Sequence, residues 1–226
     1  MNNTKRITLY LCLSLLLILS SCHSRNELAN GDLILVGLPY DYSMTQEEPN
    51  TRDYSQGTNY IHVAMLNVEK DGLWVVDATL KHGVDRYPLD TFLHDFTLPD
   101  GNYPRFEIFR LKNNREADNY MDNAKTFVGR AYDVDFLLEN EAQYCSELVY
   151  NSYVSSVGVP LFHQVAMNFK NLDSKYPLYW KELFDFIDHP IPQGKQGTTP
   201  ESLTHEESLQ QMDIDLVEQA KAWGRK

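Results

Sequence analysis

The stretch YIHVAMLNVEKDGLWVVDA, residues 60–78, decides the fold. Its two apolar runs, residues 60–66 and 73–78, are rich in the β-branched and aromatic side chains that favour strands. Between them lies Asp71-Gly72, a dipeptide that is typical of tight hairpin turns. The stretch therefore predicts two antiparallel strands joined by a short turn.

The flanking sequence predicts further strands and then helices. Strands are expected at residues 33–36, 83–87 and 106–111, and helices or helical turns at 88–96, 114–128, 145–155, 177–186 and 204–223. The last helix is favoured by the capping-box spacing of Thr204 and Glu207. Strands that come first with helices around them indicate the α+β class, in one domain over residues 31–226. Residues 37–58 are long for a loop in such a domain and could gate a cleft.

The N-terminus has the layout of a secretory signal peptide. Lys5 and Arg6 precede an apolar run over residues 7–19, and Leu19-Ser20-Ser21-Cys22 follows with small residues at the expected cleavage point. The apolar run is shorter than the roughly 18 residues that are read as a membrane span, so a signal anchor is the weaker alternative.

The segment that ends at Cys22 resembles a bacterial lipobox. In lipoproteins that cysteine becomes the first mature residue and carries lipid, and its acyl chains anchor the protein stably to a membrane. The resemblance implies that residues 1–21 are removed, that Cys22 is lipidated and that residues 22–30 form a tether. We expect a protein of the bacterial cell envelope, anchored by lipid, with the outer membrane favoured and the periplasmic or outer face left open.

Charge and motif content narrow the classes of partner. The chain has a formal net charge of −12, and loss of Lys5 and Arg6 with the signal would make it more acidic still. Such a charge repels nucleic acid and anionic surfaces. The sequence contains no CxxC, HExxH or paired-histidine spacing and no glycine-rich phosphate loop after a strand, so we expect no metal and no nucleotide cofactor. The oligomeric state cannot be predicted.

The three cysteines have different expected fates. Cys12 leaves with the signal peptide, Cys22 carries lipid, and Cys145 is left as a single thiol in a compartment that favours disulfides. A lone thiol in an exported protein is either reactive or an inert buried side chain. The cysteine count alone does not separate these alternatives.

The surroundings of Cys145 favour reactivity. Residues 144–150, YCSELVY, place it where a loop is expected to become a helix. The partial positive charge and the N–H groups at the start of a helix favour a thiolate and could also hold a developing oxyanion. A thiolate in that position would be a good nucleophile toward a carbonyl carbon.

A catalytic base would have to come from one of seven histidines, and only His62 sits inside an apolar strand-like run. A strand holds its side chain in a fixed direction, which suits a base; the alternative is a core histidine with a neighbouring partner. Asp77 could orient the imidazole from the other strand of the hairpin. A turn centred on Asp71-Gly72 pairs position 62 with position 81, however, so Asp77 would be a few residues out of register unless a bulge or a longer turn intervenes. A solvent-facing acid is the alternative for Asp77.

Five segments then occur in an order that resembles one family. They are Gly31-Asp32-Leu33-Ile34, Ile61-His62-Val63-Ala64, Val76-Asp77-Ala78, Gly129-Arg130-Ala131-Tyr132-Asp133 and Tyr144-Cys145-Ser146-Glu147-Leu148-Val149. Together they are similar to the circularly permuted, papain-like branch of the NlpC-type cysteine hydrolases, called YiiX- or YaeF-like. The resemblance spans residues 31–200 or so, and its specificity lies in the ordered set rather than in any one segment.

The resemblance implies a fold and a set of roles. The fold would be an antiparallel sheet or small barrel flanked by helices. Cys145 would be the nucleophile, His62 the general base and Asp77 the group that orients the imidazole, at a position where glutamate is common in the family. The substrate-binding residues would be Tyr144, Tyr132 and Asp133.

The implied activity is acyl transfer through a thioester at Cys145. We expect hydrolysis of an amide bond in a peptide, such as a cell-wall stem peptide. The main alternative is a lipid-directed amidase or acyltransferase that uses the same residues. A second alternative is a binding lipoprotein without catalysis.

Overall fold

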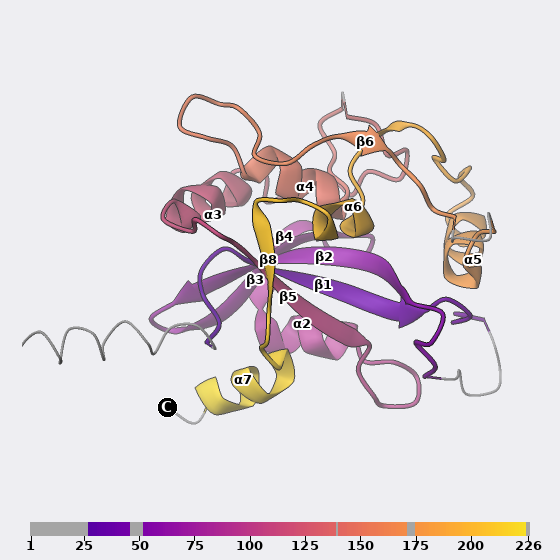
Figure 1. Cartoon of the computed structure of the whole chain (residues 1–226), viewed down its shortest axis with the longest axis horizontal. Coiled ribbons are helices and arrows are strands. Elements are labelled where there is room, and N and C mark those ends of the chain that lie inside the picture. Colours follow the sequence, from indigo (N-terminus) through magenta and orange to yellow (C-terminus); the bar gives the residue numbers. More distant parts are fainter. Residues whose placement is uncertain (1–26, 46–51, 139, 171–174, 225–226) are drawn as a thin grey trace, which may run out of the picture.

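A six-stranded antiparallel sheet forms the centre of the molecule (Figure 1). The computed structural model describes residues 27–45, 52–138, 140–170 and 175–224. The strand order is β4-β3-β2-β1-β5-β8. The strands are β1 (Asp32–Pro39), β2 (Thr58–Glu69), β3 (Gly72–Thr79), β4 (Gly83–Pro88), β5 (Arg105–Leu111) and β8 (Leu209–Met212). Because β4 and β8 lie at opposite edges, the sheet is open, and of the two predicted forms the antiparallel sheet is confirmed and the small barrel is wrong.

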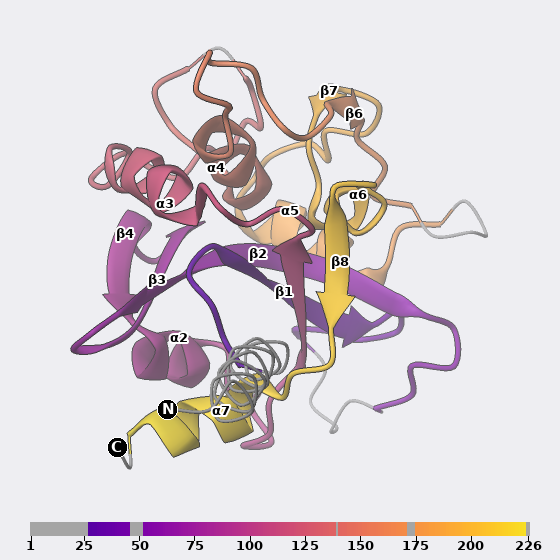
Figure 2. The same cartoon turned by 60° about the vertical axis from the view of Figure 1, so that its left-hand side comes forward.

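Helices cover both faces of the sheet (Figure 2). One face packs against α3 (Ala117–Lys125), α4 (Cys145–Ser152) and α6 (Pro200–Thr204), and the other against α2 (Leu89–Asp95) and α7 (Leu216–Trp223). Side chains alternate along each strand, so Leu33 and Leu35 enter the first core and Ile34 and Val36 the second. Every residue of β1 is buried, as expected for a central strand covered on both sides.

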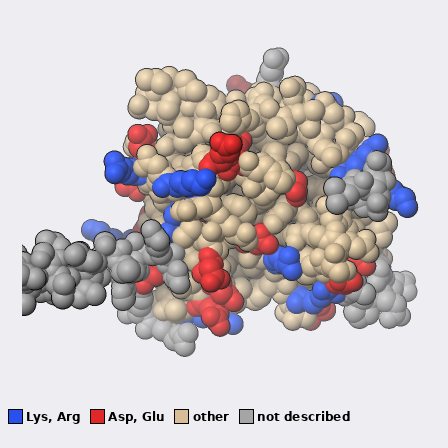
Figure 3. Space-filling model, viewed as in Figure 1, with Lys and Arg blue, Asp and Glu red and all other residues tan. Residues whose placement is uncertain are grey.

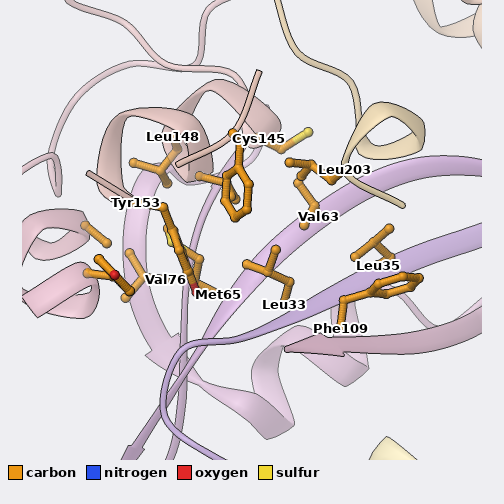
Figure 4. Close-up of a cluster of buried hydrophobic side chains, with 14 of the residues drawn as sticks. Leu33, Leu35, Val63, Met65, Val76, Phe109, Cys145, Leu148, Tyr153 and Leu203 are labelled. Atoms are coloured by element: carbon orange, nitrogen blue, oxygen red, sulfur yellow. The ribbon is translucent and has the colours of Figure 1, made fainter. Parts of the chain in front are cut away.

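Helix α4 is held over the sheet by apolar contacts. Leu148 of this helix and Tyr153, the residue directly after it, pack in one cluster with Val63, Met65 and Val76 of the strands, and Figure 4 shows Cys145 at the start of the helix. The sheet and the helix that carries the candidate nucleophile thus share one core. Burial on this scale fixes the position of a side chain at the first turn of the helix.

A smaller apolar cluster lies beside the sheet. It joins α5 (Leu178–Phe186) to the segments around Phe136 and Phe169, and the two-residue strands β6 (Val165–Ala166) and β7 (Gln196–Gly197) form a ribbon next to it. In Figure 1, α6 and β6 lie above the sheet, and α5 lies at the right, beside the ends of β1 and β2. The sequence predicted α5 but not the short ribbon, which is too brief to leave a pattern.

The predicted C-terminal helix over residues 204–223 is wrong. The chain instead forms α6, then β8, then α7. The helix cap is made by Thr199, whose side chain accepts the backbone N–H of Ser202, and not by Thr204. Residues 209–212 extend because β5 offers an open edge, with which β8 pairs from Ile108↔Met212 to Leu111↔Leu209. A tertiary contact has overridden the local helical preference.

The predicted hairpin is present, but its register is wrong. Glu69 pairs with Gly72, so the turn residues are Lys70 and Asp71. The register runs through Met65↔Val76. A turn centred on Asp71-Gly72 would instead have paired position 65 with position 78, so the observed register is shifted by two residues.

The expected signal peptide at residues 1–21 and the expected lipidation site at Cys22 lie outside the described residues, as does most of the expected tether. Within the part of the chain that the structure describes, no helix is both long and apolar enough to cross a membrane.

Candidate active site

A cavity of about 130 Å³ opens where α4 begins above β2 and β3. Cys145 and His62 both line it. The other lining residues are mostly apolar or aromatic: Ile61, Ala78, Thr79, Leu80, Phe96, Tyr132, Phe136, Ser146, Phe169, Tyr179, Trp180, Leu183, Thr198, Thr199 and Pro200. We call this space the catalytic cavity, and its apolar walls strengthen electrostatic interactions between the groups that it contains.

Cys145 is the first residue of α4 and is 5% exposed. The preceding residue, Tyr144, is extended, and its backbone N–H donates a hydrogen bond to the carboxyl group of Glu147 at 3.2 Å. The expected loop-to-helix junction is therefore present, with Cys145 placed at the positive end of the helix.

A bulge in β2 positions His62. The pairing of β1 with β2 passes from Val36↔His62 to Gly37↔Tyr60, so Ile61 is an extra residue on β2. Bulges re-aim the side chains beside them. The imidazole packs against the ring of Phe96, with centroids 5.0 Å apart.

Asp77 lies beside His62 in spite of the wrong predicted register. The observed register continues to place Asp77 opposite Ala64, which is diagonal to His62 on the same face of the sheet, and diagonal neighbours are within reach of long side chains. The Nε2 of His62 and the Oδ2 of Asp77 are 3.0 Å apart. An ionised carboxylate only accepts, so Nε2 donates and Nδ1 is left for the sulfur.

Tyr87 completes this chain of hydrogen bonds. Its hydroxyl donates to the Oδ1 of Asp77 at 2.8 Å, from the neighbouring strand β4. Asp77 is 1% exposed, and both of its oxygens are occupied. The sequence did not identify Tyr87, because a tyrosine in a strand is indistinguishable there from a core residue.

The protonated form of His62 is stabilised. Burial alone would lower the pKa of the imidazole, but the charge of Cys145 and the hydrogen bonds to Asp77 and Cys145 together outweigh it and raise the pKa from 6.5 to about 9. The three residues that the sequence proposed as catalytic are thus brought together. At neutral pH the raised pKa keeps His62 in its protonated form.

The three predicted substrate-binding residues are placed differently from one another. Tyr132 lines the catalytic cavity. The hydroxyl of Tyr144 instead accepts the backbone N–H of Thr198, and Asp133 accepts the backbone N–H groups of Asp135 and Leu137. Neither Tyr144 nor Asp133 is among the residues that line the cavity.

Thr198 is held next to Cys145 by Tyr144 and Ser146, the residues on either side of that cysteine. Besides the bond from its N–H to Tyr144, its carbonyl oxygen accepts the hydroxyl of Ser146 at 3.0 Å. The approach is close, because a Cβ on Gly197 would lie 2.6 Å from the hydroxyl oxygen of Tyr144. The Oγ1 of Thr198 is buried and has no hydrogen-bond partner among the described residues. Nothing in the sequence marked Thr198, since it lies about fifty residues downstream of Cys145 and in no motif.

On the face of the molecule that Figure 3 draws, acidic and basic side chains are interspersed. Among the described residues, no group of three or more His, Cys, Asp and Glu side chains is arranged to hold a metal ion. The ionisable side chains that line the catalytic cavity are Cys145, His62, Tyr132 and Tyr179.

Comparison with known proteins gives a similar sequence and a similar fold. The chain is 23% identical over 150 residues to the uncharacterized protein YiiX of Escherichia coli strain K12, an alignment that covers 65% of this chain and 69% of YiiX. Its fold is similar to the crystal structure of the metalloprotein YiiX from Escherichia coli O157:H7, with a TM-score of 0.56, 20% identity and coverage of 84% of this chain and 98% of that one.

A family model extends this likeness to most of the chain. The model of the permuted papain-like amidase enzymes, YaeF/YiiX, matches residues 27–212. This range includes Cys145, His62 and Asp77 and the residues that line the cavity. The chain belongs to this family, the C92 family of permuted papain-like amidases.

Proposed function

We propose that the protein is a cysteine hydrolase that cleaves an amide bond, with Cys145 as nucleophile, His62 as acid and base, and Asp77 as the group that orients the imidazole. One observation carries the proposal: a buried imidazole lies between a carboxylate at 3.0 Å and a thiol at the start of a helix. The raised pKa of His62 is what such a pair needs to keep a proton ready for a leaving amine.

The chemistry proceeds in two halves. The sulfur of Cys145 forms a bond to the carbonyl carbon, the C–N bond breaks, and the amine leaves with the proton from His62. A water molecule then gives a proton back to His62 and attacks the thioester, so that the carboxylic acid is released and the thiolate–imidazolium pair is restored. No metal or cofactor takes part in these steps.

A negative oxygen develops on the substrate in both halves, and Thr198 is suited to stabilise it. Its hydroxyl is buried, has no partner among the described residues, and belongs to a residue that lines the same cavity as Cys145. A preorganised donor of this kind is worth about 10²–10³ in rate where it has been removed from other enzymes. We assign Thr198 to the oxyanion site, and Tyr144 and Ser146 to holding it in place.

The proposed substrate is an amide in a peptide, such as a cell-wall stem peptide. An amide of a lipid is the second candidate, which is favoured by the aromatic lining of the catalytic cavity. Lipidation at Cys22 and a location at the bacterial envelope remain part of the proposal, because a lipoprotein there would meet both kinds of substrate. A protein with Cys22→Ala that stays bound to membranes after carbonate washing would contradict the anchor.

The test is turnover of a panel of peptides, N-acyl lipids and esters by the wild type and by Cys145→Ala. We expect the wild type to hydrolyse an amide and the alanine variant to be inactive on it. Turnover of every substrate by the alanine variant would end the assignment of the nucleophile. Alkylation of the thiol by iodoacetamide is a second readout, since a binding protein without catalysis gives the rate of an unactivated thiol.

A further inference from the structure

A second hollow adjoins the catalytic cavity. It has a volume of about 600 Å³ and lies where the start of β2 meets α5, α6 and the β6–β7 ribbon. Phe169, Trp180 and Thr199 line both spaces, so these three residues form the boundary that the two spaces share. We call the second space the Trp180 groove. Its volume is in the range of small-molecule sites, and a ligand that reacts at Cys145 and continues past Trp180 would enter it.

The Trp180 groove is more polar than the catalytic cavity. Its walls include Asn168, Lys170, Glu201 and His205. The Oε1 of Glu201 lies 3.4 Å from the Nε2 of His205, and the ammonium of Lys170 lies over the ring of Tyr176. These charged groups therefore already have partners within the protein.

Asn59 differs from these charged residues because one of its polar atoms has no hydrogen-bond partner among the described residues. Asn59 lines the groove from β2 and is 6% exposed. Its Nδ2 is buried and makes no hydrogen bond within the described part of the chain. A buried amide donor without a partner destabilises the folded protein, because it has lost its hydrogen bonds to water, so such an atom calls for an explanation.

The orientation of the Asn59 amide is determined by Trp180. The indole Nε1 donates to the Oδ1 of Asn59 at 2.8 Å. An indole N–H can only donate, so the oxygen must face Trp180 and the NH₂ group must face the other way. Trp180, which lines both spaces, thus also fixes the amide of Asn59, and the NH₂ group of that amide has no partner among the described residues.

The chemistry of the wall selects the partner of that donor. A neutral amide N–H₂ binds a carbonyl oxygen or a carboxylate, and Glu201, an acid that lines the same groove, disfavours a second carboxylate there. We infer that the Nδ2 of Asn59 donates a hydrogen bond to a backbone amide carbonyl of a peptide substrate that extends from Cys145 across Trp180. This inference rests on the proposed hydrolase activity and deepens it: where the acyl side of the substrate enters the groove, it selects a peptide over a lipid amide, because an acyl chain offers no acceptor there.

The test uses two series of short peptides that share one scissile amide and are extended residue by residue on the acyl side or on the amine side. In one series the wild type should gain on the order of 10-fold in kcat/KM at the length whose carbonyl reaches Asn59, the worth of one hydrogen bond. Asn59→Asp keeps the acceptor for Trp180 but replaces the donor with an oxygen. The ratio of kcat/KM between the longer and the shorter peptide should then fall to about one or below.

Asn168→Asp is the matched control. Asn168 is exposed in the same wall, and its Oδ1 accepts the backbone N–H of Lys170, so the change adds the same charge without removing the donor of Asn59. For Asn168→Asp, the ratio of kcat/KM between the longer and the shorter peptide should stay close to that of the wild type. A second arm needs no variant: replacing the relevant amide of the longer peptide by its alkene isostere should remove the gain in the wild type.

The outcomes separate the inference from the proposed function. If the wild type gains nothing with length in either series, or if Asn59→Asp keeps the gain, the inference is overturned while Cys145-dependent turnover still stands. If the wild type turns over N-acyl lipids and no peptide, the inference is likewise overturned. If Cys145→Ala turns over the peptides as well as the wild type does, the hydrolase proposal itself fails.

Discussion

At the scale of residues, the hydrogen bonds around His62 favour its protonated form, which is the form that the proposed amide hydrolysis needs in order to protonate the leaving amine. Tyr87, Asp77 and His62 form a continuous chain of hydrogen bonds from three neighbouring strands, and it ends at the thiol of Cys145. A chain of this kind fixes the ring orientation and favours the charged imidazole. In the proposed mechanism, the protonation state of His62 controls the departure of the amine.

The pH dependence of the reaction follows from this. The pKa of His62 is raised from 6.5 to about 9, so the imidazolium persists at neutral pH and is lost as the pH rises through about 9. We expect kcat/KM for an amide to fall above about pH 9, because neutral His62 has no proton for the leaving amine. Alkylation by iodoacetamide should not fall there, since it needs only the thiolate. A basic limb near pH 6.5, or no basic limb up to the pH of unfolding, would contradict the assignment.

Thr198 gives a second prediction at this scale. Thr198→Val keeps the shape of the side chain and removes the hydroxyl, so kcat should fall by about 10²–10³ with little change in KM. Thr198→Ser should recover most of the rate, because it restores a hydroxyl. Steady-state kinetics on one amide substrate measures both. Equal losses in the two variants would point to packing instead, and a Val variant with wild-type kcat would remove Thr198 from the oxyanion site.

At the scale of elements, the start of α4 carries a buried acid beside the nucleophile. Glu147 is fully buried; burial, assisted by Asp133, raises its pKa from 4.5 to about 8, against the lowering effect of the Tyr144 N–H and of Arg130. The folded protein therefore holds this proton more tightly than the unfolded chain does. Its stabilising contribution is complete below about pH 4.5 and is lost as the pH rises through about 8.

Glu147→Gln should remove this pH dependence. Glutamine stays neutral and can still accept the N–H of Tyr144, so the variant should gain in free energy of unfolding relative to the wild type between about pH 5 and pH 8. The gain should be at least about 1 kcal/mol, the worth of one pKa unit. Urea unfolding across that range measures the difference. A difference that is constant with pH would show that Glu147 is ionised in the fold at every pH tested.

The elements also show which parts of the fold a sequence can predict. The hairpin, the strands at residues 83–87 and 106–111 and the helix at Cys145 were predicted because periodicity and turn residues are local signals. The bulge at Ile61 and the strand β8 were not, because each depends on a partner strand far along the chain. The same reason explains why Cys145 and His62 could be proposed from their surroundings, whereas Thr198 and Asn59 could not.

At the scale of the whole molecule, the last helix closes one face of the sheet. Leu216 of α7 is 1% exposed and packs with the residues of α2 and of the central strands. Residues 209–223 are therefore part of the same folded unit as the candidate site, and the site depends on a sheet that α7 helps to cover.

Leu216→Ala should lower the free energy of unfolding by about 2–5 kcal/mol, because it leaves a cavity in this core. Glu218→Ala, an exposed change on the same helix, is the control and should stay within about 0.5 kcal/mol of the wild type. Urea unfolding of both variants checks this. A Leu216 variant as stable as the control would mean that α7 is not docked on the sheet.

The central claim is that Cys145 becomes acylated by an amide substrate while His62 supplies the proton. Intact-protein mass spectrometry after rapid acid quench tests it most directly. We predict a mass increase equal to the acyl group on the wild type, mapped by proteolysis to Cys145, and no such adduct on His62→Ala at the same time of quench. Turnover of the amide with no adduct at any time, or an adduct on a residue other than Cys145, would contradict the account.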